Sequence, residues 1–491
     1  MSNMEHMSVE EIEKSLGIQV EYNPSSFSSK TDNEAPKQKD WFGDTCKKVR
    51  DDLTGQEAQE KNEAIDNEKI HQAVIGDPKA IEFFRSKITG SLRKLNIDEK
   101  KIKYHTFYES LSDAIFHTVW GVSLLKKWEQ YPDSEAAAIR GTELWIDIDG
   151  QLVRQEERFE SEDEVLRVRR TFVNRSEDSL INSKNPELEI EREDGTRISM
   201  TQPPRSKDLY IVFRRFPIKS ATLETQAKLG TIPQEDVEIY TLFSQLMCNI
   251  ILGGPVRSAK TSFLRALLAA RSDHLIAAVM EKHFELDLKK LFPDRLIWEI
   301  QSKDGDLHNA FPKLLRMDHD YVVVGEIRGP EGEAWLQSTE RGERGGLSTY
   351  HLTDEEDIVA QVTNHILTDF PNRNYDAEFK RAAKNIELVF TFKRDHEDKR
   401  RKFLTGVTEV IWNAETKQVI YNPIIKRSRV DGEYYYNFKL SEKLVIEMLD
   451  VDKQKTKTLI NLLKERTKLR PMSKCVAGEV DEARELLGEG S

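Results

Sequence analysis

The sequence predicts an α/β protein in which a domain with a mainly parallel sheet follows a smaller α+β domain and a helical region. Short apolar runs such as NIIL, HLIAAVM and YVVVGEI alternate with amphipathic segments, as in a buried parallel sheet with crossover helices. An Asp-Gly pair between two alternating runs predicts a hairpin in the smaller domain. Apolar residues at three- and four-residue spacing predict the helices that precede it.

Composition and patterning divide the 491 residues into five segments. Residues 1–70 are polar, with few aliphatic side chains, and are expected to be largely disordered. Residues 71–131 form the helical region, 132–235 the α+β domain and 236–430 the α/β domain, while 431–491 are expected to form a helical tail.

Local signals justify the elements of the smaller domain. The run TELWIDIDGQLVRQEERF, which starts at Thr142, alternates around its Asp-Gly turn. Ser161 followed by Glu164 is a capping pattern that starts a predicted helix. The runs ELEIEREDGTRISMTQPP and DLYIVFRRF are predicted to add further strands.

The overall composition excludes several classes of protein. A formal net charge of -12 argues against a general nucleic-acid-binding role. Cys46, Cys248 and Cys475 lie far apart without metal or redox spacing, which indicates a reduced, intracellular protein. No run approaches the roughly 18 apolar residues that span a bilayer, and the amino terminus has no signal-peptide pattern. We expect a cytoplasmic protein that meets a membrane only through partners, without inserting into it.

The stretch GPVRSAKT fits the template of a phosphate-binding loop between a strand and a helix. In such loops backbone amides cradle the phosphates, the lysine carries positive charge to them and the hydroxyl ligates magnesium. The sequence therefore predicts an ATP and Mg²⁺ site at Gly254, Pro255, Val256, Arg257, Ser258, Ala259, Lys260, Thr261 and Ser262.

Two residues depart from this template. Arg257 and Ala259 stand where glycines are usual, and an alanine held at positive φ costs about 1–2 kcal/mol. Arg257 could contact the phosphates or stabilise the loop. The competing interpretation is a strand–turn–helix joint with an accidental Lys-Thr pair.

A carboxylate on a second strand favours the nucleotide site. The apolar run that starts at Tyr321 ends in Gly325-Glu326. A carboxylate at the carboxyl end of a strand beside the loop can organise magnesium and the attacking water. Glu326 is therefore predicted to be catalytic and, with Thr261, to serve the metal.

Four ordered motifs make the chain resemble the ATPases of type II and type IV secretion systems, in particular their tight-adherence pilus (CpaF-like) branch. LRMDHDYVVVGEIRGPE resembles the Walker B region of that family, and GERGGLSTYH resembles its histidine box. AAVMEKHFEL stands at its acidic box, while DGTRISMTQPP and IVFRRF resemble the end of its N-terminal domain. The resemblance implies a RecA-like P-loop domain preceded by a PAS-like α+β domain.

The resemblance also assigns roles to single residues. Glu281 and Glu285 match the glutamates of the acidic box, and Glu281 would be a second catalytic carboxylate. His351 would sense the γ-phosphate, and Arg197 and Arg214 would reach the nucleotide from the N-terminal domain. Simpler alternatives remain for each of these residues. The glutamate could be merely solvated, the histidine could be structural, and the arginines could form salt bridges.

Several residues differ from the family pattern. Lys282 replaces an aspartate of the acidic box, and Glu343 replaces the first histidine of the histidine box. Asp318 and His319 replace an Arg-Pro pair. Arg328, directly after the catalytic strand, is expected to pair across a subunit boundary.

The function implied by this resemblance is that of an ATP-hydrolysing motor. It would act as a homohexamer on a membrane platform protein of a secretion, pilus-assembly or conjugation-like machine. The altered motif residues leave open a non-hydrolysing nucleotide-binding scaffold or regulator. A DNA-translocating motor is a further alternative, which the net acidity disfavours.

Overall fold

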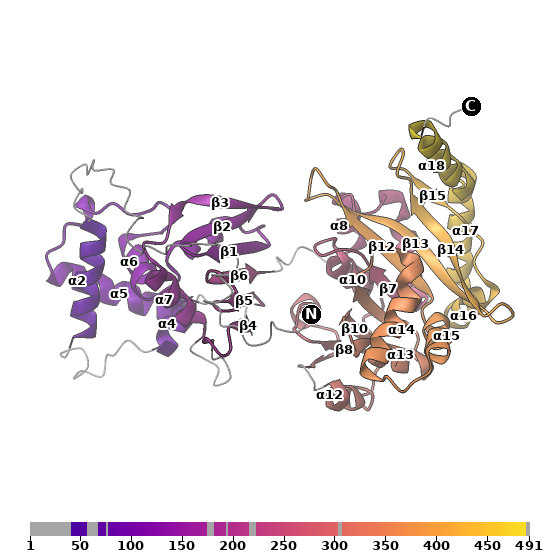
Figure 1. The fold of residues 1–491 in the computed structure, drawn as a ribbon, viewed down its shortest axis with the longest axis horizontal. Coiled ribbons are helices and arrows are strands. Elements are labelled where there is room, and N and C mark those ends of the chain that lie inside the picture. The colour runs from indigo at the N-terminus through magenta and orange to yellow at the C-terminus, as the bar shows by residue number, and fades with distance from the viewer. Residues whose placement is uncertain are drawn as a thin grey trace, which may run out of the picture.

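The protein has two lobes, an N-terminal lobe before residue 216 and a C-terminal lobe after residue 221 (Figure 1). Each lobe is built around its own sheet, of six and of nine strands respectively. The computed structural model describes residues 41–55, 67–74, 77–173, 181–192, 195–215, 222–302 and 307–487.

Helices cover the end of the N-terminal lobe that lies farthest from the C-terminal lobe (Figure 1). They are α2 Trp41–Thr54, α4 Asn67–Val74, α5 Pro78–Lys94, η1 Glu99–Lys101, α6 Leu111–Val119 and η2 Ser123–Gln130. Asp77 caps α5, since its side chain accepts a 2.8 Å hydrogen bond from the backbone N–H of Ala80.

The prediction of disorder is wrong for residues 41–54, which form α2. Cys46 and Val49 are buried, and Phe42 and Leu53 pack on the same apolar cluster as α5. These four residues recur at helical spacing, so a single narrow stripe is enough to dock an otherwise polar helix. Residues 1–40 and 56–66, also expected to be disordered, lie outside the described residues.

The six strands of the N-terminal lobe form an antiparallel sheet in the order β3-β2-β1-β6-β5-β4. They are β1 Ala136–Arg140, β2 Glu143–Ile148, β3 Gln151–Arg158, β4 Glu187–Glu191, β5 Arg197–Thr201 and β6 Tyr210–Arg214, with helix α7 Glu162–Val173 between β3 and β4. The predicted hairpin is confirmed: Asp149 and Gly150 connect β2 to β3 with φ of 54° and 81°. Ser161 accepts a 3.3 Å hydrogen bond from the backbone N–H of Glu164 at the start of α7.

The nine strands of the C-terminal lobe follow the order β15-β14-β13-β12-β7-β11-β10-β8-β9. The six strands from β12 to β9 are parallel, as predicted, and β13 to β15 continue the sheet in antiparallel pairing. The strands are β7 Ile250–Gly253, β8 Ala277–Glu281, β9 Ile297–Gln301, β10 Tyr321–Ile327, β11 Leu347–Tyr350, β12 Leu388–Arg394, β13 Lys402–Asn413, β14 Gln418–Arg427 and β15 Tyr434–Tyr436.

Helices pack on both faces of this sheet, and each face has its own apolar cluster. They are α8 Leu223–Lys228, η3 Gln234–Asp236, α9 Val237–Gln245, α10 Lys260–Ala269, α11 Leu288–Leu291, α12 Leu307–Leu314, α13 Glu331–Glu340, η4 Glu355–Asp357, α14 Ile358–Asp369, α15 Tyr375–Asn385, α16 Glu442–Val451, α17 Lys453–Leu469 and α18 Met472–Leu486. Helices α9, α10, α16 and α17 join one cluster, whereas α13, α14 and α15 join the other.

The tail after residue 430, expected to be helical, contains helices but begins with a strand. Strand β15 pairs with β14, and Tyr434 and Tyr436 are buried. Three residues are too few for a period-two pattern to stand out in a sequence. The helices after β15 also belong to the core, since Met448 of α16 and Leu459 of α17 are fully buried.

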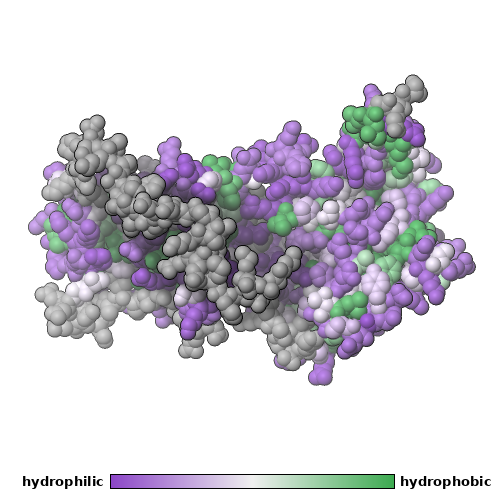
Figure 2. Space-filling model, in the orientation of Figure 1, coloured by the Kyte–Doolittle hydropathy of each residue, from purple (hydrophilic) through white to green (hydrophobic). Residues whose placement is uncertain are grey.

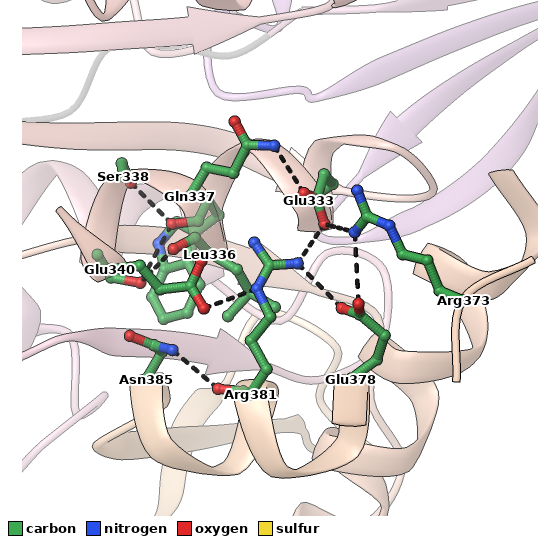
Figure 3. Close-up of polar contacts among 11 residues, drawn as sticks. Glu333, Leu336, Gln337, Ser338, Glu340, Arg373, Glu378, Arg381 and Asn385 are labelled. Carbon is green, nitrogen blue, oxygen red and sulfur yellow. Dashed lines mark hydrogen bonds and ion pairs between the residues drawn. The ribbon is translucent and has the colours of Figure 1, made fainter. Parts of the chain in front are cut away.

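A buried ion-pair network joins α13 to α15 (Figure 3). Glu333 accepts hydrogen bonds from Arg373 at 2.8 Å and from Arg381 at 2.5 Å. Arg381 also donates to Glu340 and to Glu378. Helix α13 follows β10, the strand that carries Glu326, so the network holds the helix that comes directly after the candidate site.

The start of β7 is held by a second buried carboxylate. Glu387 accepts a 2.9 Å hydrogen bond from the backbone N–H of Asn249 and pairs with Arg344 at 2.7 Å. The side chain of Asn249 accepts from the backbone N–H of Gly346. These contacts fix the strand that leads into the phosphate loop between its two neighbours.

The described surface is mostly hydrophilic on the face seen in Figure 2. Apolar side chains gather there at the end of α18, where Leu486 is 80% and Leu487 74% exposed. Within the described ranges, no helix combines the length and the apolar character that crossing a bilayer requires.

Candidate functional site

A cavity of about 160 Å³ lies between the two lobes. The segment from β7 to α10 contributes residues 256–262, and the N-terminal lobe contributes Glu135 before β1, Arg197 of β5, and Arg214 and Arg215 at the end of β6. The other lining residues that matter to its chemistry are Glu285, Glu326, Arg328, Thr349, His351 and Lys402. Most of the residues predicted from the sequence therefore meet at one place.

The loop after β7 has the tight backbone of a phosphate cradle. A Cβ atom on Gly254 would lie 2.5 Å from the carbonyl oxygen of Phe392, so only glycine fits there. Ala259 has φ 76° and ψ 11°, directly before the first residue of α10. This left-handed conformation costs an alanine about 1–2 kcal/mol. Arg257 is also left-handed, with φ 61°.

Lys260 is folded back onto this loop. Its ammonium group donates to the carbonyl oxygens of Gly254 at 2.8 Å and of Pro255 at 2.7 Å. Burial lowers the pKa of Lys260 to about 8. The buried hydroxyl of Ser258 has no hydrogen-bond partner within the described part of the chain. A cation and an unused hydroxyl beside a narrow glycine turn are suited to phosphate oxygens.

Glu326, near the end of β10, is held from two sides. Its carboxylate pairs with Arg328 at 2.6 Å and with Nε2 of His351, which follows β11, also at 2.6 Å. Burial and the nearby Lys260 lower the pKa of His351. Neighbouring parallel strands therefore bring these side chains together, as predicted for the carboxylate and the histidine. Arg328 pairs within its own chain in this structure, whereas the sequence suggested a partner across a subunit boundary.

Glu281, predicted to be a second catalytic carboxylate, is not among the residues that line the cavity. It is 5% exposed, and its side chain packs behind the cavity against Gly325, where an added Cβ atom would lie 2.8 Å from its Cγ. The backbone N–H of Leu286 donates to Oε1 at 3.0 Å, while Oε2 has no partner among the described residues. Burial raises the pKa of Glu281 well above its ordinary value, which favours a neutral acid.

The second acidic-box residue, Glu285, does line the cavity and forms an ion pair with Arg197 of β5. Arg197 and Arg214 are directly paired across β5 and β6, so both guanidinium groups belong to the same edge of the N-terminal lobe. Burial, with the repulsion of nearby Arg257, lowers the pKa of Arg214. Both arginines predicted from the sequence therefore reach the cavity, one of them through a salt bridge.

Three further ion pairs join the lobes, and the sequence analysis predicted none of them. Arg257 lies 3.9 Å from Asp147 of β2. Lys402 pairs with Glu135 at 2.9 Å, and Arg400 pairs with Asp149 at 3.1 Å. The residues of each pair are far apart in the chain, so no local pattern could have identified them.

Two departures from the family pattern compensate for each other. Nε2 of His319 lies 3.0 Å from the carboxylate of Glu343, and Nδ1 lies 2.5 Å from the carbonyl oxygen of Met317. This pair does not line the cavity. Glu343 therefore serves a structural contact, while His351 remains at the site.

The donor set fits a nucleotide and its magnesium ion. The described residues contain no group of three or more His, Cys, Asp or Glu side chains able to hold a metal. Magnesium that arrives with a nucleotide needs only one or two protein ligands besides phosphate and water. Thr261 and Glu326 both line the cavity and offer a hydroxyl and a carboxylate.

The chain is similar to several known proteins. Residues 146–370 match the model of a family described as type II/IV secretion system protein. Over this part of its length, the chain is similar to that family. The matching part of the chain runs from β2 to the end of α14 and includes residues from both lobes that line the cavity.

An uncharacterized protein of Bacillus anthracis, pXO2-25, is 24% identical to this chain over 163 residues. The match covers 33% of the present chain and 35% of the relative, so it spans about a third of the relative's length.

Three solved structures that are similar to this chain are two ATPases and a pilus retraction motor. The VirB11 ATPase of the Brucella suis type IV secretion system, in complex with sulphate, is 16% identical, with 58% of this chain and 95% of that chain covered and a TM-score of 0.32. The Legionella pneumophila ATPase DotB is 14% identical, with 69% and 86% covered and a TM-score of 0.41. The pilus retraction motor PilT with bound ADP is 14% identical, with 70% and 89% covered and a TM-score of 0.42.

Proposed function

We propose that this protein is an ATP-hydrolysing motor of a secretion, pilus-assembly or conjugation-like system. The observation that carries the proposal is the convergence of three separate parts of the chain at one cavity. They are the glycine turn with Lys260, the carboxylate of Glu326 with His351, and the arginines of the N-terminal lobe. If the Lys-Thr pair of the loop were accidental, we would not expect the carboxylate–histidine pair and the arginines to lie beside it.

The cavity is suited to a triphosphate by its charge. Lys260, Arg197, Arg214, Arg257 and Arg328 all line it. Planar guanidinium groups match phosphate oxygens, and partly buried cations interact with them more strongly than exposed ones do. In the proposed complex Lys260 leaves its loop carbonyls for the phosphates, while Thr261 and Glu326 hold the magnesium ion. Bound magnesium would supply neutralisation of the phosphate charge.

Glu326 is the best-placed group to orient water and receive its proton. The contact with Nε2 of His351 and the ion pair with Arg328 hold its carboxylate from two sides. Water that attacks the γ-phosphate needs such a positioned acceptor, and the products are ADP and phosphate. Glu281 supports this geometry from behind Gly325 instead of sharing the proton.

Because the cavity lies between lobes, loss of the γ-phosphate changes the contacts that hold them together. We propose that the resulting lobe motion passes around a homohexameric ring. The ring would work on a membrane platform protein from the cytoplasmic side.

The alternative is a non-hydrolysing scaffold or regulator of such a system. Ala259 at positive φ, the replaced acidic-box aspartate at Lys282 and the buried Glu281 favour it. Such a protein would bind nucleotide weakly, or bind it without turnover.

Magnesium-dependent ATP turnover by the purified protein tests both alternatives. We expect Lys260→Ala to lose nucleotide binding and Glu326→Gln to bind nucleotide with turnover reduced by at least about 100-fold. Arg205→Gly, which removes an exposed arginine paired with Glu187 at 3.0 Å far from the cavity, is the control and should keep parental turnover. Binding without turnover in the parent would favour the scaffold, and no binding in the parent would refute the nucleotide site.

A further inference from the structure

Arg257 stands inside the phosphate loop, yet its only ion pair among the described contacts is with the other lobe. Its Nη1 lies 3.9 Å from Oδ2 of Asp147, at the end of β2. The Arg257 side chain is 21% exposed and that of Asp147 is 4% exposed. The pair thus crosses the cleft at the position where a glycine is usual in loops of this type.

Asp147 is poorly satisfied in this arrangement. Its Oδ1 atom is buried and has no hydrogen-bond partner within the described ranges, while Oδ2 has Arg257 at the long end of ion-pair range. The strongest carboxylate–guanidinium pairs use two short hydrogen bonds. The ion pair between Asp147 and Arg257 is therefore weak, because only one carboxylate oxygen takes part in it. A phosphate oxygen can therefore compete for Arg257.

Arg257 also lies next to other cations. It lines the cavity together with Lys260, Arg197 and Arg214, and its charge contributes to the lowered pKa of Arg214. An anion in the cavity relieves this repulsion. Each lobe donates one arginine to the other. Arg197 of the N-terminal lobe pairs with Glu285 of the C-terminal lobe, and Arg257 of the C-terminal lobe pairs with Asp147 of the N-terminal lobe.

We propose that Arg257 is a positioning residue that exchanges Asp147 for a nucleotide phosphate and so couples occupancy of the loop to the position of the N-terminal lobe. This inference rests on the proposed function, because it requires a nucleoside triphosphate in the cavity. Without nucleotide, the Arg257–Asp147 pair draws the lobes together. With nucleotide, Arg257 turns to the phosphates and Asp147 is released.

The exchange predicts opposite effects of its two partners on affinity. Arg257→Gly removes a phosphate ligand and should weaken ATP binding by about tenfold or more, the value of a charge-assisted hydrogen bond. Asp147→Asn removes the competitor and should tighten ATP binding by about two- to fivefold, the value of a modest ion pair.

The same two variants should act alike on the nucleotide-free protein, because each breaks the contact between the lobes. Energy transfer between dyes on cysteines at the exposed positions Val153 and Val430 reports lobe separation. The native Cys46, Cys248 and Cys475 are buried and should not compete for the dyes. Labelled protein is mixed with excess unlabelled protein, so that only transfer within a chain is seen.

The experiment measures the Kd of ATP and the dye separation for the parent, both variants, Arg205→Gly and Lys260→Ala. The exchange would be supported if Arg257→Gly raises and Asp147→Asn lowers the Kd of ATP, while both variants increase the dye separation in the absence of nucleotide. Equal Kd for the parent and Arg257→Gly, or weaker binding by Asp147→Asn with an unchanged melting temperature, would overturn it while leaving the proposed function intact. A parent that binds no ATP would overturn both proposals together.

Discussion

Replacing Ala259 by glycine should stabilise the protein, whereas an alanine-to-glycine change within a helix is ordinarily destabilising. Ala259 adopts φ 76° and ψ 11°, a left-handed conformation that costs a non-glycine residue about 1–2 kcal/mol. Glycine at this position removes that cost but adds about 0.4–1 kcal/mol of backbone freedom to the unfolded chain. Ala259→Gly should therefore stabilise the protein, by about 0.5–1 kcal/mol.

The assay is urea unfolding followed by pulse proteolysis, which reports the midpoint at which the intact chain is lost. The matched control is Ala360→Gly in α14, where the same atom is removed from a right-handed helical residue. That variant should be destabilised by up to about 1 kcal/mol. If both variants shift the urea midpoint downward by similar amounts, the left-handed strain at Ala259 is not a real cost and the reasoning is refuted.

Two further predictions follow from buried charges. Because burial lowers the pKa of Lys260 to about 8, ADP affinity should stay level below pH 8 and fall about tenfold per unit above it, as the ammonium group that binds phosphate loses its proton. Calorimetric titration with ADP from pH 7 to 9 checks this. Any residual ADP binding by Lys260→Ala should not change with pH over this range, and the same pH-independent affinity in the parent would contradict the prediction. Burial alone would raise the pKa of Glu333, but hydrogen bonds from Arg381 and Arg373 outweigh it and hold this pKa below its ordinary value. The stabilisation is therefore present above about pH 4.5 and lost as pH falls through the lowered pKa. Glu333→Gln should cost about 3 kcal/mol at neutral pH, more than Glu340→Gln at the rim of the same network, and equal urea midpoints for the two would argue against the buried pair.

Local chemistry explains why much of the site could be predicted. The phosphate loop is contiguous, and its strand–turn–helix context is contained in about twenty residues from Asn249 onward. The hairpin at Asp149-Gly150 and the helix start at Ser161 depend on neighbouring residues in the same way. Glu326 could be predicted because the carboxyl ends of neighbouring parallel strands meet at one edge.

The features that could not be predicted from the sequence depend on burial. Glu281 and Glu285 are four residues apart and equally acidic, yet one packs behind Gly325 and the other lines the cavity. Their difference comes from where β8 ends relative to β10, which no spacing in the sequence reports. Helix α2 and strand β15 were missed for a related reason, since each is stabilised by a few contacts with distant elements.

The sequence alone determined which residues could handle phosphate, because loop geometry, a lysine and a strand-end carboxylate are short-range features. Only the tertiary structure decided how they are used. It tied Lys260 to its own loop, set Arg257 against Asp147 and made Glu281 a buried acid. Those outcomes depend on the order of strands in the sheet and on the contact between two lobes. Both bring together residues that are far apart in the chain, and burial at these contacts sets the charge and partner of each group.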